Sequence, residues 1–169
     1  GMLPFGARLF ATTSGALLVV ARGTEPEIEY YDPDGRLVRI VRWPDQPRNV
    51  SDAEFEAYLE AEFASIPEEQ REAVRARLGT IPHAERAPPY QDLVSSDQGA
   101  IWVGDFPGQG AAAARSSRTW LVVDDDGHVR ERVATPVGFQ PHFVARGRVY
   151  GVFVDDFGVE TVRAYPLGS

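Results

Sequence analysis

Clustered carboxylates are the first residues in this sequence that could do chemistry. They occur at residues 32–35 (Asp-Pro-Asp-Gly) and 124–127 (Asp-Asp-Asp-Gly). A calcium loop of the EF-hand type needs a bidentate carboxylate at its twelfth position, which is occupied here by Trp43 and Thr135. Both clusters instead lie between alternating apolar runs, and Asp-Gly in that setting is a strong signal for a β-hairpin. They therefore predict turns and no metal site.

The other residues with catalytic potential lack partners at a useful spacing. His83, His128 and His142 are the only histidines, and no two of them have the spacing of metal ligands. The chain has no cysteine, which excludes thiol catalysis and thiolate metal sites. Its serines lack the Gly-x-Ser-x-Gly setting of a hydrolase nucleophile. The sequence therefore predicts no catalytic centre, no metal and no cofactor.

Aromatic and polar residues near a loop of small residues give the one signal for ligand binding. Trp102 and Asp105 precede this loop, at residues 107–117, and most of the aromatic residues nearby are expected in the core. His142 begins a strand that could face a central channel, and Arg8 stands at the start of another. We take these four as candidate ligand-binding residues. In an alternative, Arg8, Asp105 and His142 converge on a channel and serve a lyase or a hydrolase.

The amino-acid composition limits the kinds of partner that this protein could bind. The net charge of −8 argues against nucleic acid, because a phosphate backbone requires a basic surface. The longest apolar run, residues 16–21, is too short to cross a bilayer. The first residues have no basic segment followed by an apolar one, so we expect no secretory signal within this chain. The sequence predicts a soluble protein without a nucleic-acid or membrane partner.

Alternating apolar residues and turn residues predict a mainly β chain. The first four strands are expected at residues 8–12, 16–22, 27–32 and 36–43, and residues 16–22 have the continuous apolar character of a strand buried on both faces. Further strands are expected at residues 91–96, 100–106, 118–124, 128–135, 141–145, 148–155 and 159–165. Antiparallel pairing of successive strands would give blade-like sheets of four.

A helical hairpin interrupts the strands at residues 51–79. Ser51 and Glu54 have the spacing of a capping box, which marks the start of a helix. Apolar residues then recur at helical spacing, and Pro67 opens a second helix that we expect to end at Gly79. An insertion of this size is expected to cover one end of the scaffold, where binding loops lie.

The strands group into three units within one domain at residues 2–169. The units span residues 8–43, 91–135 and 140–165, and the third has only three strands. Units of about 40–50 residues with four strands each are typical of β-propellers. The fold class predicted is therefore a partial β-propeller of antiparallel four-stranded sheets with an inserted αα-hairpin.

Three segments carry a resemblance to a known family. Residues 93–103 (LVSSDQGAIWV), 120–133 and 150–167 resemble the C-terminal half of uncharacterised bacterial six-bladed β-propeller proteins, which are related in architecture to NHL and TolB-type propellers. The helical insertion after Arg-Trp-Pro at residues 42–44 fits the same resemblance. The resemblance implies the blade architecture and assigns no functional residue.

Three blades are too few to close a ring, so their flanks would be exposed. We therefore expect self-association as a homodimer or a higher oligomer, with a small molecule or a protein as a further ligand. The function predicted is that of a binding or scaffold module. Two alternatives stay open: the propeller-type lyase or hydrolase with a polar channel site, and a non-autonomous fragment of a longer, exported propeller protein. The compartment is left open.

Overall fold

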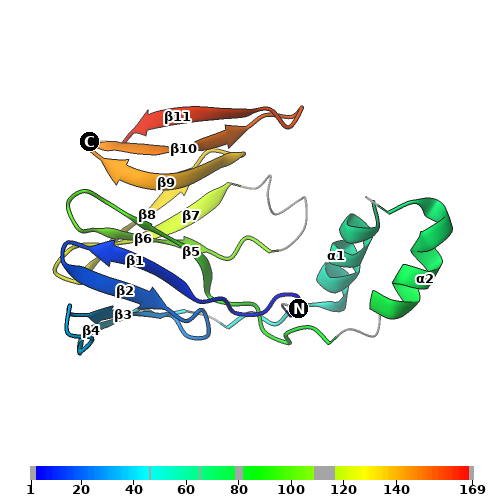
Figure 1. Cartoon of the computed structure of the whole chain (residues 1–169), viewed down its shortest axis with the longest axis horizontal. Coiled ribbons are helices and arrows are strands. Elements are labelled where there is room, and N and C mark those ends of the chain that lie inside the picture. Colours follow the sequence, from blue (N-terminus) through cyan, green and yellow to red (C-terminus); the bar gives the residue numbers. More distant parts are fainter. Residues whose placement is uncertain (1–2, 46, 65, 79–81, 109–116, 168–169) are drawn as a thin grey trace.

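The computed structural model describes residues 3–45, 47–64, 66–78, 82–108 and 117–167, which form three antiparallel sheets and two helices (Figure 1). In each sheet the strands follow chain order. Sheet 1 contains β1 (Phe10–Ser14), β2 (Leu17–Ala21), β3 (Glu27–Tyr31) and β4 (Leu37–Arg42). Sheet 2 contains β5 (Tyr90–Ser95), β6 (Ile101–Asp105), β7 (Arg118–Val123) and β8 (Val129–Thr135). Sheet 3 contains β9 (Phe139–Ala145), β10 (Arg148–Val154) and β11 (Glu160–Pro166).

The two acidic clusters are hairpin turns, as predicted. In the first, the amide of Gly35 donates to the carbonyl of Asp32, and the Asp32 carboxylate accepts from the amide of Arg36 at 2.8 Å. The second repeats this pattern between Asp124 and His128. Gly35 has a φ of 78°, in the left-handed region that glycine tolerates without strain. Local turn chemistry therefore sets the antiparallel order of the strands.

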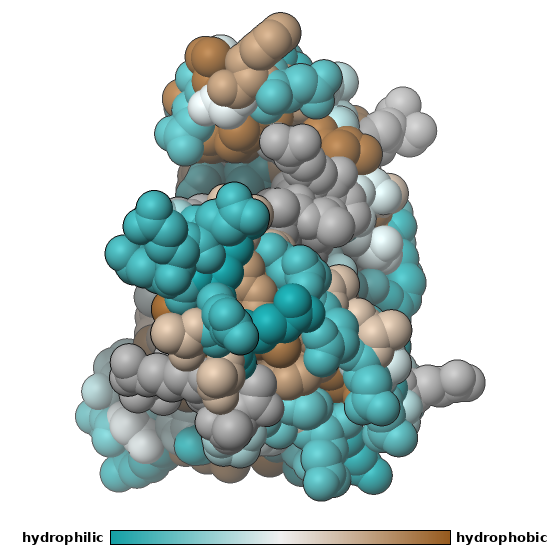
Figure 2. Space-filling model, turned by 90° about the vertical axis from the view of Figure 1, so that its right-hand side faces the viewer, coloured by the Kyte–Doolittle hydropathy of each residue, from teal (hydrophilic) through white to brown (hydrophobic). Residues whose placement is uncertain are grey.

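The insertion between sheets 1 and 2 forms α1 (Asp52–Ala64) and α2 (Glu68–Leu78). The predicted capping box is present: the Glu54 amide donates to the Ser51 hydroxyl at 3.2 Å, and the Ser51 amide donates to the Glu54 carboxylate at 3.1 Å. Figure 2 faces the helical hairpin and shows many hydrophilic residues over it. The predicted helix end at Gly79, and residues 109–116 of the predicted small-residue loop, lie outside the described residues.

Two connecting segments, residues 47–51 and 82–89, form a stem between the helices and the sheets. The amide of Val50 donates to the carbonyl of Glu85 at 2.9 Å, and the amide of Ala87 donates to the carbonyl of Arg48 at 2.9 Å. The N-terminal segment joins them, since the amide of Ala84 donates to the carbonyl of Pro4. The stem therefore fixes where the helical hairpin leaves the sheets.

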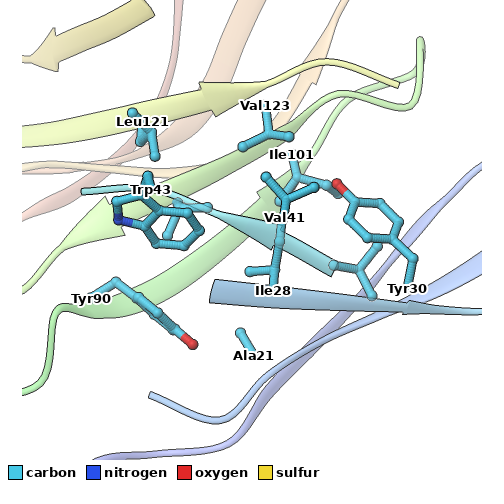
Figure 3. Close-up of a cluster of buried hydrophobic side chains, with 11 residues drawn as sticks. Ala21, Ile28, Tyr30, Val41, Trp43, Tyr90, Ile101, Leu121 and Val123 are labelled. Atoms are coloured by element: carbon cyan, nitrogen blue, oxygen red, sulfur yellow. The ribbon is translucent and has the colours of Figure 1, made fainter. Parts of the chain in front are cut away.

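The three sheets stack face to face, with sheet 2 in the middle (Figure 1). One face of sheet 2 packs on sheet 1, where Tyr30, Trp43 and Tyr90 are among the side chains that converge (Figure 3). Its other face packs on sheet 3 around Trp102 and Trp120. In the described part of the chain the three sheets do not close on one another into a ring.

The first strands of the three sheets lie next to one another. The hydroxyl of Ser14, at the end of β1, donates to the carbonyl of Gly99 in the β5–β6 turn at 2.6 Å. The amide of Asp97 in that turn donates to the carbonyl of Val144 in β9 at 2.9 Å. We call β1, β5 and β9 the inner strands, because each is the first strand of its sheet in the chain and contacts the first strand of a neighbouring sheet.

One prediction for the strands was wrong. Residues 16–22 were expected to be buried on both faces, but only one face of β2 is covered. Val19 and Ala21 are buried against sheet 2, while Leu18 is 45% exposed on the opposite face. The reason is that sheet 1 has a neighbouring sheet on one side only.

Among the described helices, neither is long and apolar enough to cross a bilayer.

A close approach of two strands makes Gly151 a sensitive position. A Cβ at Gly151 in β10 would overlap the carbonyl oxygen of Gln140 in β9 and lie 2.8 Å from the ring of Phe139. We expect Gly151→Ala to lower the free energy of unfolding by about 3 kcal/mol, measured by urea denaturation, because backbone atoms must move apart. The control is Gly147→Ala, where a Cβ meets no atom within 4 Å, and which should cost only the 1 to 2 kcal/mol, roughly, of a positive φ. Equal losses in the two variants would contradict this prediction.

Candidate functional site

A polar pocket of about 200 Å³ lies where the ends of sheets 1 and 2 meet the stem of the helical hairpin. Residues just after β4, at the end of β6 and on β8 form one side of it, and the two stem segments form the other. We call it the stem pocket. It is lined by Trp43, Asp45, Arg48, Ala87, Pro88, Pro89, Asp105, Phe106 and Arg132.

Asp105 is the central ionisable group of the stem pocket. Its two carboxylate oxygens accept hydrogen bonds from the Arg132 guanidinium at 3.3 and 3.1 Å. Burial raises the pKa of the Asp105 carboxyl above its usual value, the nearby Asp45 carboxylate raises it further, and Arg132 opposes both effects. Asp105 therefore holds its proton to a higher pH than an ordinary surface aspartate.

Arg48 connects the stem pocket to helix α1. Its guanidinium forms an ion pair with Glu54 in the first turn of the helix and lies 6.0 Å from the centre of the Phe106 ring. Phe5 packs edge-on against both Phe106 and Tyr58 of α1, with ring centres 6.3 and 5.8 Å apart. One wall of the pocket is therefore held by the same contacts that hold the helical hairpin.

A second polar group lies between sheets 2 and 3. Arg118, only 8% exposed, donates to Asp92 at 3.2 Å and to Gln140 at 2.8 Å, and the Gln140 amide donates to Asp92 at 2.6 Å. The guanidinium lies 4.7 Å above the Trp120 ring and passes over Gly104, where a Cβ would be 2.7 Å from it. Each member of this triad comes from a different strand, so it joins β5, β7 and β9.

Arg118 keeps two nitrogens, Nε and Nη2, without a hydrogen-bond partner in the described residues. Both are buried, so a ligand could reach them only if covering groups moved. The Asp92 carboxylate balances the positive charge of Arg118. The arrangement is therefore better suited to holding sheets 2 and 3 together than to reacting with a substrate.

The structure places the four predicted ligand residues in different surroundings. Asp105 lines the stem pocket. Trp102 is 3% exposed and packs on Trp120, at the edge of a cleft of about 470 Å³ between β8 and β11. His142 is exposed on β9, and Arg8 is exposed ahead of β1. Within the described ranges, no hydrogen bond, ion pair or ring contact joins any two of these four residues.

Sequence reasoning missed the partners of Asp105. Asp45 and Arg48 reach the stem pocket from the segment between β4 and α1, whereas Arg132 reaches it from β8, and no spacing in the sequence indicates that these two segments meet. The triad of Asp92, Arg118 and Gln140 was also missed. Over the ranges that the structure covers, no group of three or more histidine, aspartate or glutamate side chains is placed to hold a metal ion.

No protein-family model matches this chain, and no curated protein matches it either. The resemblance to bacterial six-bladed propellers therefore stays a prediction from the sequence.

The neighbours of Asp105 should shift its pKa in opposite directions. We expect Asp45→Asn to lower the pKa of Asp105, since it removes a like charge, and Arg132→Gln to raise it, since it removes the ion pair. Because the folded-state pKa is raised, the stability of the wild type should fall as pH rises from about 3.8 through that pKa, and Asp105→Asn should remove this fall. A ¹³C NMR titration of the carboxyl carbon measures the shifts, and a pKa that is the same in all three proteins would contradict the assignment.

The triad around the buried Arg118 should matter for stability more than a surface pair does. Arg118→Met removes the donor to the Gln140 side-chain oxygen and the positive charge that balances Asp92, and we expect a loss of about 2 to 3 kcal/mol in urea denaturation. Arg130→Met is the matched control, because Arg130 pairs with Asp124 at 2.5 Å but is exposed. That variant should change the free energy of unfolding by less than about 0.5 kcal/mol. Similar losses would show that the triad has no special role.

Proposed function

We propose that this protein is a binding module, built as a partial β-propeller of three blades, whose stem pocket takes a small organic cation. The observation that carries the proposal is the stem pocket itself, a polar recess with acidic, basic and aromatic walls. It lies where strand ends meet an insertion, which is where scaffolds of this kind carry their binding residues.

The propeller architecture is supported by the arrangement of the sheets. Each sheet is a meander that begins at an inner strand, and consecutive inner strands are joined by hydrogen bonds at their ends. Each sheet also packs its faces on its neighbours, as the blades of a propeller do. Sheet 3 has three strands where the other two have four, as the repeat in the sequence predicts.

The charges of the stem pocket favour a cation. Asp45 and Asp105 are both acidic, and Arg132 neutralises one of them through its ion pair with Asp105. Arg48 is already neutralised by Glu54. Asp45 makes no hydrogen bond or ion pair with any described residue, so one negative charge is left for a ligand. A primary ammonium group on a short apolar chain fits this charge, and the Phe106 and Trp43 rings offer apolar contact.

Binding is better supported than the lyase or hydrolase alternative. That alternative places Arg8 and His142 with Asp105 in one channel, and neither of these two residues is among those that line the stem pocket. The ionisable groups that act on Asp105 in this pocket are Asp45 and the ion-paired Arg132, a set that holds or orients a ligand more readily than it transforms one.

A panel of matched small molecules tests the ligand class. In a ¹⁵N NMR titration we expect n-butylammonium to shift the amides of Asp45, Asp105 and Phe106, while butyrate and butanol leave them unchanged. Asp45→Asn should weaken this binding roughly tenfold, which is about 1.4 kcal/mol. Asp34→Asn, which changes an exposed carboxylate in a distant turn, should bind as the wild type does. Binding of butyrate in preference, or no shift at tens of millimolar ammonium, would refute the proposal.

A further inference from the structure

The outer face of sheet 1, which points away from sheet 2, is largely apolar. Leu18 lies opposite Tyr31 on the neighbouring strand, and Val20 and Ile40 lie on either side of Glu29 on this face. Leu18 is 45% exposed and Ile40 is 36% exposed. A hollow of about 410 Å³ lies on this face, lined mainly by Leu18, Val20, Tyr31 and Pro33 with their neighbours. Contiguous apolar surface of this kind marks an interaction site more often than a free surface.

The charges on this face are already paired. Glu29 accepts from Arg22 at 3.1 Å and from the Tyr31 hydroxyl at 2.8 Å, and Glu27 pairs with Arg42 at 2.6 Å. A partner that covers the face would therefore not have to bury an unpaired charge, which is the main cost of covering polar residues.

The outer face of sheet 3, at the other end of the stack, is also apolar. Tyr150 lies opposite Phe143, and Val152 lies opposite Val162. Phe143 is 43% exposed and Val162 is 83% exposed. Figure 2 shows apolar residues at the top of the molecule, which is the end formed by sheet 3.

The three sheets are stacked in the same way twice, and the two free faces are the two ends of this stack. Sheet 1 uses one face to pack on sheet 2, and sheet 2 uses its opposite face to pack on sheet 3. The next step of the same repeat would begin at the outer face of sheet 3 and end at the outer face of sheet 1. Two copies of the chain can cover each other's free faces, because head-to-tail contacts that close into a ring leave no face exposed.

We propose that two copies of this chain join head to tail, with the outer face of sheet 3 in each copy packed on the outer face of sheet 1 in the other. The product is a closed ring of six sheets. This inference rests on the propeller architecture in the proposed function and is independent of the ligand of the stem pocket.

The area of the faces is sufficient for a stable pair. Strands about 4.8 Å apart, with a rise of about 3.3 Å per residue, give each face about 300 Å² even when drawn flat. Four faces are covered in the closed pair, so about 1,200 Å² or more is buried once side chains are included. Stable and specific interfaces bury roughly 1,200 to 2,000 Å². A single junction buries half of this area and should be much weaker.

Light scattering after gel filtration tests the pairing on the full chain. We expect the wild type at twice the chain mass of 18.6 kDa. Leu18→Glu on sheet 1 and Val162→Glu on sheet 3 should each raise the dissociation constant at least a hundredfold. Both residues are exposed, so circular dichroism should show folded variants. Val137→Glu is the control, because Val137 is also exposed but lies in the turn before β9, outside the strands that make up the two faces, and it should remain a dimer.

Mixing the two variants distinguishes head-to-tail pairing from pairing of like faces. Leu18→Glu keeps an intact sheet 3 face and Val162→Glu keeps an intact sheet 1 face, so an equimolar mixture at millimolar concentration should regain the dimer mass through one junction. If like faces paired, one single variant would stay dimeric. A monomeric wild type, a dimeric single variant or a mixture that stays monomeric would each overturn the proposal. The ammonium titration can be repeated on the monomeric variants, so failure of the ring and failure of the binding site are separate results.

Discussion

The burial of sheet 2 on both faces is the constraint on which the rest of the structure depends. Along β6, Ile101 and Val103 point toward sheet 1 while Trp102 points toward sheet 3, and all three are buried. Each such side chain contributes about 1.5 to 3 kcal/mol by leaving water. Among the described residues, neither of the other two sheets is covered on both faces. In the part of the chain that the structure describes, sheets 1 and 3 share no hydrophobic cluster, so each depends on sheet 2 for its position.

The polar groups between the sheets follow from this layered packing. Arg118 can lie between sheets 2 and 3 because Gly104 leaves room beside the Trp120 ring and because Asp92 and Gln140 neutralise and orient it. At the same ends of the strands, the stem of the helical hairpin covers the edge between sheets 1 and 2 and creates the stem pocket. The insertion therefore adds a polar pocket without disturbing the order of the strands.

The sequence predicted local features well and contacts between distant segments poorly. Strand and helix bounds agree with the structure to within about two residues, since alternation, the glycine turns and the Ser51 capping box act over a few residues. The exposure of Leu18 was not foreseen, because it depends on which faces have a neighbouring sheet. Asp105 was a candidate, but its partner Arg132 lies 27 residues away, and no local pattern records such a pairing. The predicted ligand-binding roles of Arg8 and His142 stay predictions, because no contact among the described residues bears on them.

Binding and self-association would use separate surfaces of this molecule. The stem pocket is lined by residues just after β4, by residues at the end of β6 and on β8, and by the stem, whereas the two free faces lie at opposite ends of the stack (Figure 1). Closing the ring would therefore neither cover the pocket nor complete it, and each copy would bring its own. Because Trp43 and Asp45 directly follow β4, and the outer face of sheet 1 would pack on the second copy, pairing would hold these two residues more rigidly. Packing of the apolar faces would therefore restrict motion in the pocket, because sheet 1 is rigid and connects the two.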